Sequence, residues 1–171
     1  MPKHFLSAIV VAGSLLLAAC NPTYNWRDYS SPDAPYRVMF PAKPATHTRS
    51  VDLNGMRVDM TMTAAEVEGA TFAVGTGTAP DPARAQAALG DMRTALLRNL
   101  GAQAEPASTP GAAAQAGADL DVTGTANGQP IKLRAHFAAQ GNRFYQVIVM
   151  GREKTVPVEQ ADQFISSFKL L

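Results

Sequence analysis

The sequence predicts an α+β fold, in which one antiparallel sheet of about six to eight strands is covered by two helices. Several segments alternate apolar and polar residues with a period of two, and two Asn-Gly pairs join such segments. Two further segments, at about 82–100 and 156–168, are amphipathic with a helical period. Short turns make neighbouring strands antiparallel, and helices with one apolar face pack on such a sheet.

The first residues predict a secretory signal. Lys3 lies in a short basic start, and an uncharged apolar run continues from Phe5 to Ala19. This order, with small residues at its end, is typical of a cleaved signal peptide. The run is about 15 residues long, short of the roughly 20 that span a bilayer. We therefore expect residues 1–19 to be removed.

The sequence Leu17-Ala18-Ala19-Cys20 resembles the lipobox of bacterial prolipoproteins. In that family the cysteine carries a diacylglycerol thioether and its amine is acylated, which implies a lipid anchor on Cys20 in the bilayer. A plain secretory signal with an incidental or buried thiol is the alternative. Cys20 is the only cysteine, however, so it has no partner for an internal disulfide. Because Asn21 replaces the Asp that marks inner-membrane retention, the resemblance implies the outer membrane, facing the periplasm.

The residues after the cysteine predict a lipidated tether over 20–35, followed by a single domain over 36–171. Residues 21–35 contain three prolines and no periodic pattern, which is typical of a tether or an irregular start of the fold. Tyr24, Trp26 and Tyr29 allow two interpretations. Either their rings lie at the level of the lipid headgroups, or Trp26 covers one end of the core.

The first half of the domain predicts four strands and a helix. Tyr36–Phe40 is a short strand, the segments 46–53 and 56–66 flank the Asn54-Gly55 turn, and 71–75 is the fourth strand. The Gly-Thr-Gly at 75–77 lacks the lysine of a phosphate loop and is interpreted as turn glycine. Asp81 and Pro82 begin the helix. Its apolar stripe comprises Ala85, Leu89, Met92, Leu96 and Leu100, and Gly101 ends it.

The second half repeats this order. Residues 102–117 predict a loop or poor edge strand, and a strand over 119–125 leads to the Asn127-Gly128 turn. A strand with one polar face follows over 131–139. The almost wholly apolar Phe144–Met150 predicts a central strand buried on both faces. The second helix has a core stripe of Ala161, Phe164, Ile165 and Phe168.

Three pieces of this pattern resemble the PsbP-like α+β domains of photosystem II extrinsic subunits and small bacterial envelope proteins. They are the opening Tyr-Arg-Val-Met-Phe-Pro, the helix after a strand ending near Thr76-Gly77, and the strand Phe144–Met150 followed by Gln-Phe-Ile-Ser-Ser-Phe-Lys-Leu. The segment Cys-Asn-Pro-Thr-Tyr-Asn-Trp-Arg is similar to that of betaproteobacterial envelope lipoproteins. Neither resemblance implies a catalytic residue or a cofactor.

The sequence offers no catalytic set. A hydrolase needs a nucleophile beside a base, yet only His47 and His136 follow the signal. His136 falls beside Lys132 and Arg134 on the polar side of a strand, where a solvated surface role is the simpler interpretation. The spacing of His and Cys predicts no metal site. The balance of 15 Lys+Arg against 14 Asp+Glu does not favour a nucleic-acid partner.

One group of residues predicts a ligand or partner face. Basic residues fall on several strands, and an exposed sheet face carrying them would receive an anionic glycan, a lipid headgroup or an acidic partner; a merely solvated face is the alternative. The group comprises Arg57, Lys132, Arg134, His136, Arg143 and Tyr145. We expect a non-enzymatic binding or accessory domain for another envelope protein. The alternatives are a carrier or sensor of a small apolar or anionic ligand, with methionines lining its pocket, and then a hydrolase.

Overall fold

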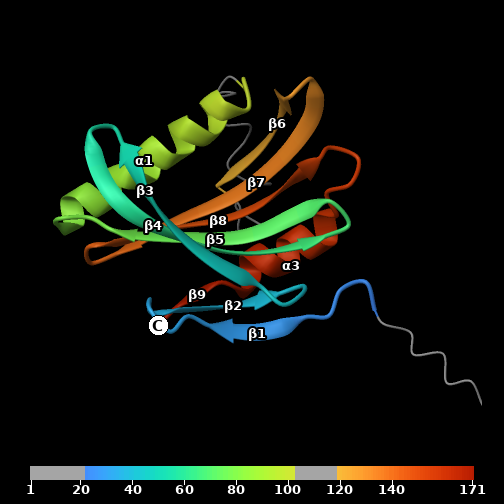
Figure 1. Cartoon of the computed structure of the whole chain (residues 1–171), viewed down its shortest axis with the longest axis horizontal. Helices are drawn as coiled ribbons and strands as arrows, with labels where there is room; N and C mark the ends of the chain where they lie inside the picture. The colour runs from blue at the N-terminus through green and yellow to red at the C-terminus, as the bar shows by residue number, and fades with distance from the viewer. Residues whose placement is uncertain (1–21, 103–118) are drawn as a thin grey trace, which may run out of the picture.

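A computed structural model describes residues 22–102 and 119–171. It confirms the α+β fold: two helices accompany an antiparallel sheet of six strands in the order β3-β4-β5-β8-β7-β6 and a separate sheet of three, β1-β2-β9 (Figure 1). Cys20, the signal segment and nearly all of the predicted loop at 102–117 lie outside the described residues.

The predicted strands and helices follow the chain in the expected order, and two strands that were not predicted, β1 and β9, lie before and after them. The strands of the six-stranded sheet are β3 (Ala45–Leu53), β4 (Met56–Val67), β5 (Ala70–Thr78), β6 (Leu120–Ala126), β7 (Gln129–Gln140) and β8 (Arg143–Arg152). The smaller sheet comprises β1 (Arg27–Ser30), β2 (Tyr36–Phe40) and β9 (Lys169–Leu170). The helices are α1 (Pro82–Asn99) and α3 (Val158–Ser167).

Local sequence explains the turns and the start of α1. Asn54 and Gly55 both have positive φ, as do Asn127 and Gly128, which is the backbone of a tight hairpin turn. The Asp81 carboxylate accepts a hydrogen bond from the Arg84 N–H at 2.8 Å and so caps α1. Both hairpins and this cap confirm the predictions.

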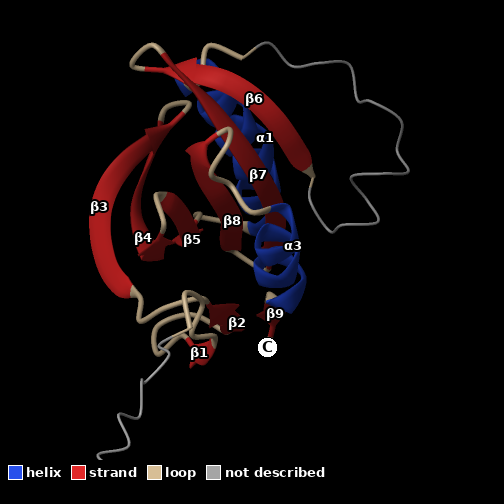
Figure 2. Cartoon of the chain, turned by 90° about the vertical axis from the view of Figure 1, so that its right-hand side faces the viewer, coloured by secondary structure: helices blue, strands red, loops and turns tan. Residues whose placement is uncertain are grey.

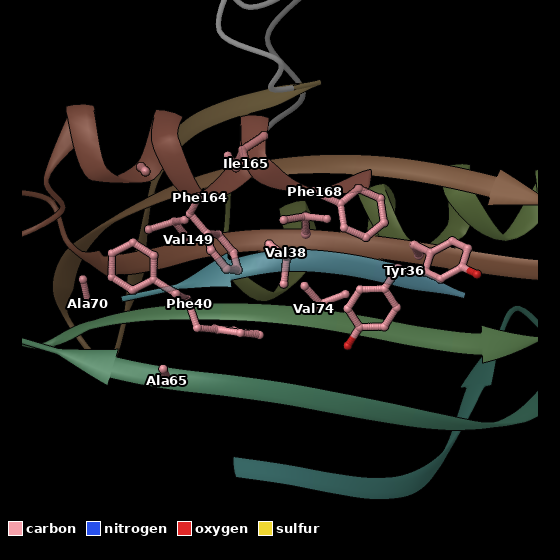
Figure 3. Close-up of a cluster of buried hydrophobic side chains, with 14 of the residues drawn as sticks. Tyr36, Val38, Phe40, Ala65, Ala70, Val74, Val149, Phe164, Ile165 and Phe168 are labelled. Atoms are coloured by element: carbon pink, nitrogen blue, oxygen red, sulfur yellow. The ribbon is translucent and has the colours of Figure 1, made fainter. Parts of the chain in front are cut away.

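The two helices cover opposite faces of the six-stranded sheet (Figures 1 and 2). On the side that we call the α1 face, α1 packs on a cluster that includes Met60, Met92 and Phe144. On the other side, the α3 face, α3 and the small sheet enclose an aromatic core around Phe72 and Phe164, drawn in part in Figure 3. Because strand residues alternate between faces, Phe144 and Tyr145 belong to different cores.

The predicted tether, residues 20–35, extends too far along the chain. Residues 27–30 form β1, which pairs with β2 from Arg27↔Phe40 to Ser30↔Arg37. Tyr24 and Trp26 both lie edge-on to the Phe72 ring, with ring centroids 6.5 and 6.4 Å away. The interpretation in which Trp26 covers one end of the core is therefore confirmed, and the folded domain begins before residue 36.

Two smaller predictions also need correction. Gly75 and Gly77 lie inside β5 and not in a turn. Glycine is required at position 75 because a Cβ there would lie 2.6 Å from the Met62 sulfur. A Cβ at Gly77 would likewise meet the Phe144 ring. The α3 helix also begins later than predicted, at Val158, because Pro157 has an extended backbone.

Candidate functional site

The register of the sheet places the six predicted site residues on one face, the α3 face, but gathers them at two separate places. Tyr145 on β8 pairs with Thr76 and Ala138 across the two neighbouring strands. Arg143 lies two residues before Tyr145 on β8 and so faces the same side of the sheet. Arg57 on β4 also faces this side. The other three residues follow one another on β7, on the far side of β8. They are Lys132, Arg134 and His136.

The group on β7 is covered by α3 and is bound to acids. The Arg134 guanidinium lies 3.3 Å from the Asp121 carboxylate of β6 and also forms an ion pair with Asp162 of α3. Lys132 forms an ion pair with the same Asp121. Only 5% of the Arg134 side chain is exposed, so it does not belong to a solvated face. These pairs tie α3 to β6 and β7.

His136 is likewise paired. Its Nδ1 lies 3.0 Å from the Asp119 carboxylate, which also accepts a hydrogen bond from the Phe137 N–H at 2.7 Å. Its ring also lies edge-on to Phe168, with the centroids 6.1 Å apart. The simple solvated role predicted for His136 was wrong, since 31% of its side chain is exposed and a carboxylate holds it.

Tyr145 does not belong to an exposed face, which corrects the prediction that grouped it there. Its side chain is fully buried against Tyr36 and Phe168. Burial raises its pKa above the ordinary value, and the nearby positive charge of Arg143 opposes the rise. The predicted surface is therefore divided in two by a buried tyrosine.

Arg57 and Arg143 remain as an open pair, and they flank a polar cleft of about 470 Å³. Its floor is formed by the adjacent strands β4, β5 and β8, and its wall by the loop between β1 and β2. Neither arginine has a carboxylate within ion-pair distance among the described residues. The other lining residues are Ser31, Asp33, Ala34, Val58, Asp59, Thr61, Thr76, Gly77 and Thr78.

The loop that forms the wall is shaped by its own side chains. The Ser31 hydroxyl oxygen accepts hydrogen bonds from the backbone N–H groups of Asp33 and Ala34 at 3.3 and 3.2 Å. This turn is local in sequence and leads into β2, where the buried Tyr36 begins the strand. Asp33 is thereby held at the rim of the cleft.

Two buried hydroxyl groups, one in the cleft and one in the adjoining core, have no hydrogen-bond partner among the described residues. The Thr76 Oγ1 and the Tyr145 hydroxyl are both buried and unpaired, and the two residues lie directly opposite each other on β5 and β8. A buried hydroxyl without a partner costs about 1–3 kcal/mol. Such groups call for a partner from outside the described side chains, and at Thr76, which lines the cleft, that partner is a water molecule or a ligand.

Sequence reasoning found the two arginines of the cleft and missed its hydroxyls and acids. The Asn54-Gly55 turn fixes the register, so the period-two rule alone would have placed Arg57, Asp59 and Thr61 on one face. The wall was missed because Ser31 and Asp33 fall in the segment that was interpreted as tether.

The described residues contain no group of three or more His, Cys, Asp or Glu side chains that would hold a metal ion. Among these same residues, no helix has the length and apolar character needed to cross a membrane. The sequence matches no protein-family model and no curated protein with significant similarity.

Proposed function

We propose that the protein is a lipid-anchored, non-enzymatic binding domain of the bacterial cell envelope, which holds another envelope component through the cleft between Arg57 and Arg143. The observation that carries the proposal is this cleft, in which two arginines and a buried threonine hydroxyl have no partner among the residues that the structure describes. Buried polar groups that converge on a concave surface are the usual signature of a binding site.

The place of the cleft suits a domain that is anchored at its amino terminus. Tyr24 packs near Phe72, at the beginning of β5, whereas the cleft includes Thr76 and Thr78 near its end. The strand rises about 3.3 Å per residue, so Thr76 lies roughly 13 Å beyond Phe72. The described chain begins on the right in Figure 1, and β5 ends on the left.

The proposed anchor would keep the domain close to its membrane. An extended chain spans at most about 3.6 Å per residue, so the four steps from Cys20 to Tyr24 reach no more than roughly 14 Å. A lipidated Cys20 would therefore place the Tyr24 end of the domain at the bilayer and turn the cleft away from it. An outer-membrane location facing the periplasm remains part of this proposal.

The apolar carrier and the hydrolase have weaker support. Met56, Met60 and Met92 are buried between α1 and the sheet, where they fill the core. His136 has a carboxylate partner, but it lies against Phe168 and does not line the cleft. A small anionic ligand is the alternative that the arginines favour.

The proposal is tested by crosslinking tagged full-length protein in its own envelope and identifying the crosslinked species by mass spectrometry. We expect one partner near a one-to-one ratio, lost in Cys20→Ala and reduced in Arg57→Gln. The matched control is Arg49→Gln, because Arg49 is an exposed arginine of the same sheet that does not line the cleft. Turnover of a cell-wall or lipid substrate by the purified protein, abolished by His136→Ala, would contradict a non-enzymatic role.

A further inference from the structure

The charges around the cleft are balanced. Arg57 and Arg143 contribute two positive charges, and Asp33 and Asp59 contribute two negative charges. Thr76 and Thr78 add hydroxyl groups along the floor, each able to donate and accept a hydrogen bond. The Thr61 hydroxyl already shares a hydrogen bond with Thr48 at 2.8 Å. Arginine is suited to a carboxylate or a phosphate, to which it donates two parallel hydrogen bonds. Carboxylates, in contrast, accept hydrogen bonds from hydroxyl groups.

We infer that this cleft binds a sugar that carries one acidic group, a carboxylate or a phosphate. The acidic group lies between Arg57 and Arg143, and the sugar hydroxyls donate to Asp33 and Asp59. The Thr76 hydroxyl, unpaired in the floor, hydrogen-bonds the ligand. This inference rests on the proposed binding function and specifies the chemical class that the cleft recognises.

The balance of charge distinguishes this class from a bare anion. A small anion without hydroxyl groups would meet the two arginines but offer no hydrogen-bond donor to the two carboxylates, so it would gain less than an acidic sugar. A sugar acid meets both kinds of group with matching partners. The volume of about 470 Å³ lies within the range of small-molecule sites. The cleft opens to solvent, so the acidic sugar is either free or the terminal residue of a glycan.

The test is isothermal titration calorimetry on the mature, lipidated protein in mild detergent. The probes are glucuronate, glucose 6-phosphate, glucose, acetate and inorganic phosphate. We expect glucuronate or glucose 6-phosphate to bind at least tenfold more tightly than glucose, acetate and phosphate. Arg143→Gln should weaken that binding at least tenfold and Thr76→Val about threefold, whereas Arg49→Gln should leave it unchanged.

A second variant protects the test against misfolding. Arg57 is exposed and has no ion-pair partner among the residues described, so Arg57→Gln should fold normally and still weaken binding about tenfold. A disaccharide ending in glucuronate distinguishes a glycan terminus from a free sugar acid. Binding of the disaccharide as tight as or tighter than that of glucuronate favours the glycan terminus, and loss of binding favours the free sugar acid.

Three results would overturn the inference. They are no binding of either acidic sugar, binding of acetate or phosphate as tight as that of the sugars, and binding that survives both arginine substitutions. Because these measurements use purified protein, their failure leaves the crosslinking result intact, so the broader binding role is judged separately.

Discussion

Thr76 and Tyr145 lie opposite each other on the two central strands β5 and β8, and within the described part of the chain the buried hydroxyl of each has no hydrogen-bond partner. This cross-strand pair marks the border between the aromatic core of the α3 face and the polar cleft, because Tyr145 belongs to the core and Thr76 lines the cleft. A fold selected for stability alone would place apolar side chains at both positions. In the binding role proposed above, the Thr76 hydroxyl is retained because it meets the ligand.

Thr76→Val should stabilise the unliganded protein while it weakens binding of the acidic sugar. Valine keeps the branched shape and removes a buried hydroxyl without a partner, so we expect a gain of about 1 kcal/mol in the free energy of unfolding. Urea denaturation followed by circular dichroism measures this change. A loss of 1 kcal/mol or more would mean that the Thr76 hydroxyl is satisfied in solution and that the cleft has been misinterpreted.

Replacing the charged Arg134 side chain with methionine should destabilise the domain strongly. Arg134→Met leaves Asp121 and Asp162 without their shared cation, and breaking a fully buried pair typically costs about 3–5 kcal/mol. Both carboxylates are partly exposed, so we expect a loss of about 2–3 kcal/mol by the same denaturation measurement.

The matched control for Arg134 is Arg84→Met, because Arg84 is exposed on α1 and forms no ion pair within the part of the chain described here. Such surface changes usually alter stability by less than about 0.5 kcal/mol. Equal effects of the two substitutions would show that the ion pairs do not tie α3 to the sheet.

Gly77→Ala should destabilise the sheet. A Cβ at this position would meet the Phe144 ring, with the Cε2 atom 2.9 Å away, and overpacking of this kind costs about 1–3 kcal/mol. Gly90→Ala is the control, since Gly90 lies in α1 with nothing within 4 Å of an added Cβ. There alanine should add about 0.5–1 kcal/mol, because glycine is less favourable inside a helix. Thermal unfolding should therefore show a lower melting temperature for Gly77→Ala and a higher one for Gly90→Ala.

Stability should fall in alkaline solution because of the buried tyrosines. Burial raises the pKa of Tyr36 and of Tyr145 above the usual value of about 10. Between the unfolded and the folded pKa the native state holds more protons than the unfolded state, so the free energy of unfolding decreases as pH rises through that interval. Their contribution is fully present below about pH 10.

Denaturation measured at a series of alkaline pH values checks this slope. Tyr145→Phe should make the decrease shallower, because one of the tyrosines with a raised pKa is then absent. A pH dependence identical to that of the unsubstituted protein would indicate that the Tyr145 hydroxyl ionises as freely when folded as when unfolded.

Local patterns predicted most of the elements, because turns, caps and alternation are properties of short segments. The Asn54-Gly55 and Asn127-Gly128 hairpins and the Asp81 cap are examples. The strand β1 was missed because its sequence, Arg-Asp-Tyr-Ser, has no apolar alternation and is held only by its pairing with β2. The sequence also did not predict that α1 and α3 lie on opposite faces of the sheet. The pattern of each helix shows which of its own sides is apolar, but not which face of the sheet that side covers.

The candidate site was predicted in part. Basic residues were assigned to one sheet face, and the register places them there. The separation of these residues into two groups was not predictable from the sequence. The ion pairs of Arg134 are with Asp121 of β6 and Asp162 of α3, which only the fold brings beside it. The cleft itself depends on the loop around Asp33, which approaches β5 only when β1, β2 and β9 form the second sheet.

The central claim, that a lipid on Cys20 holds this domain at a membrane, is tested most directly by mass spectrometry of the amino-terminal peptide from protein purified out of its envelope. We predict a chain that begins at Cys20, with a diacylglycerol thioether on the sulfur and an acyl group on the amine. A chain that keeps residues 1–19, or one that begins at an unmodified Cys20, would contradict the account.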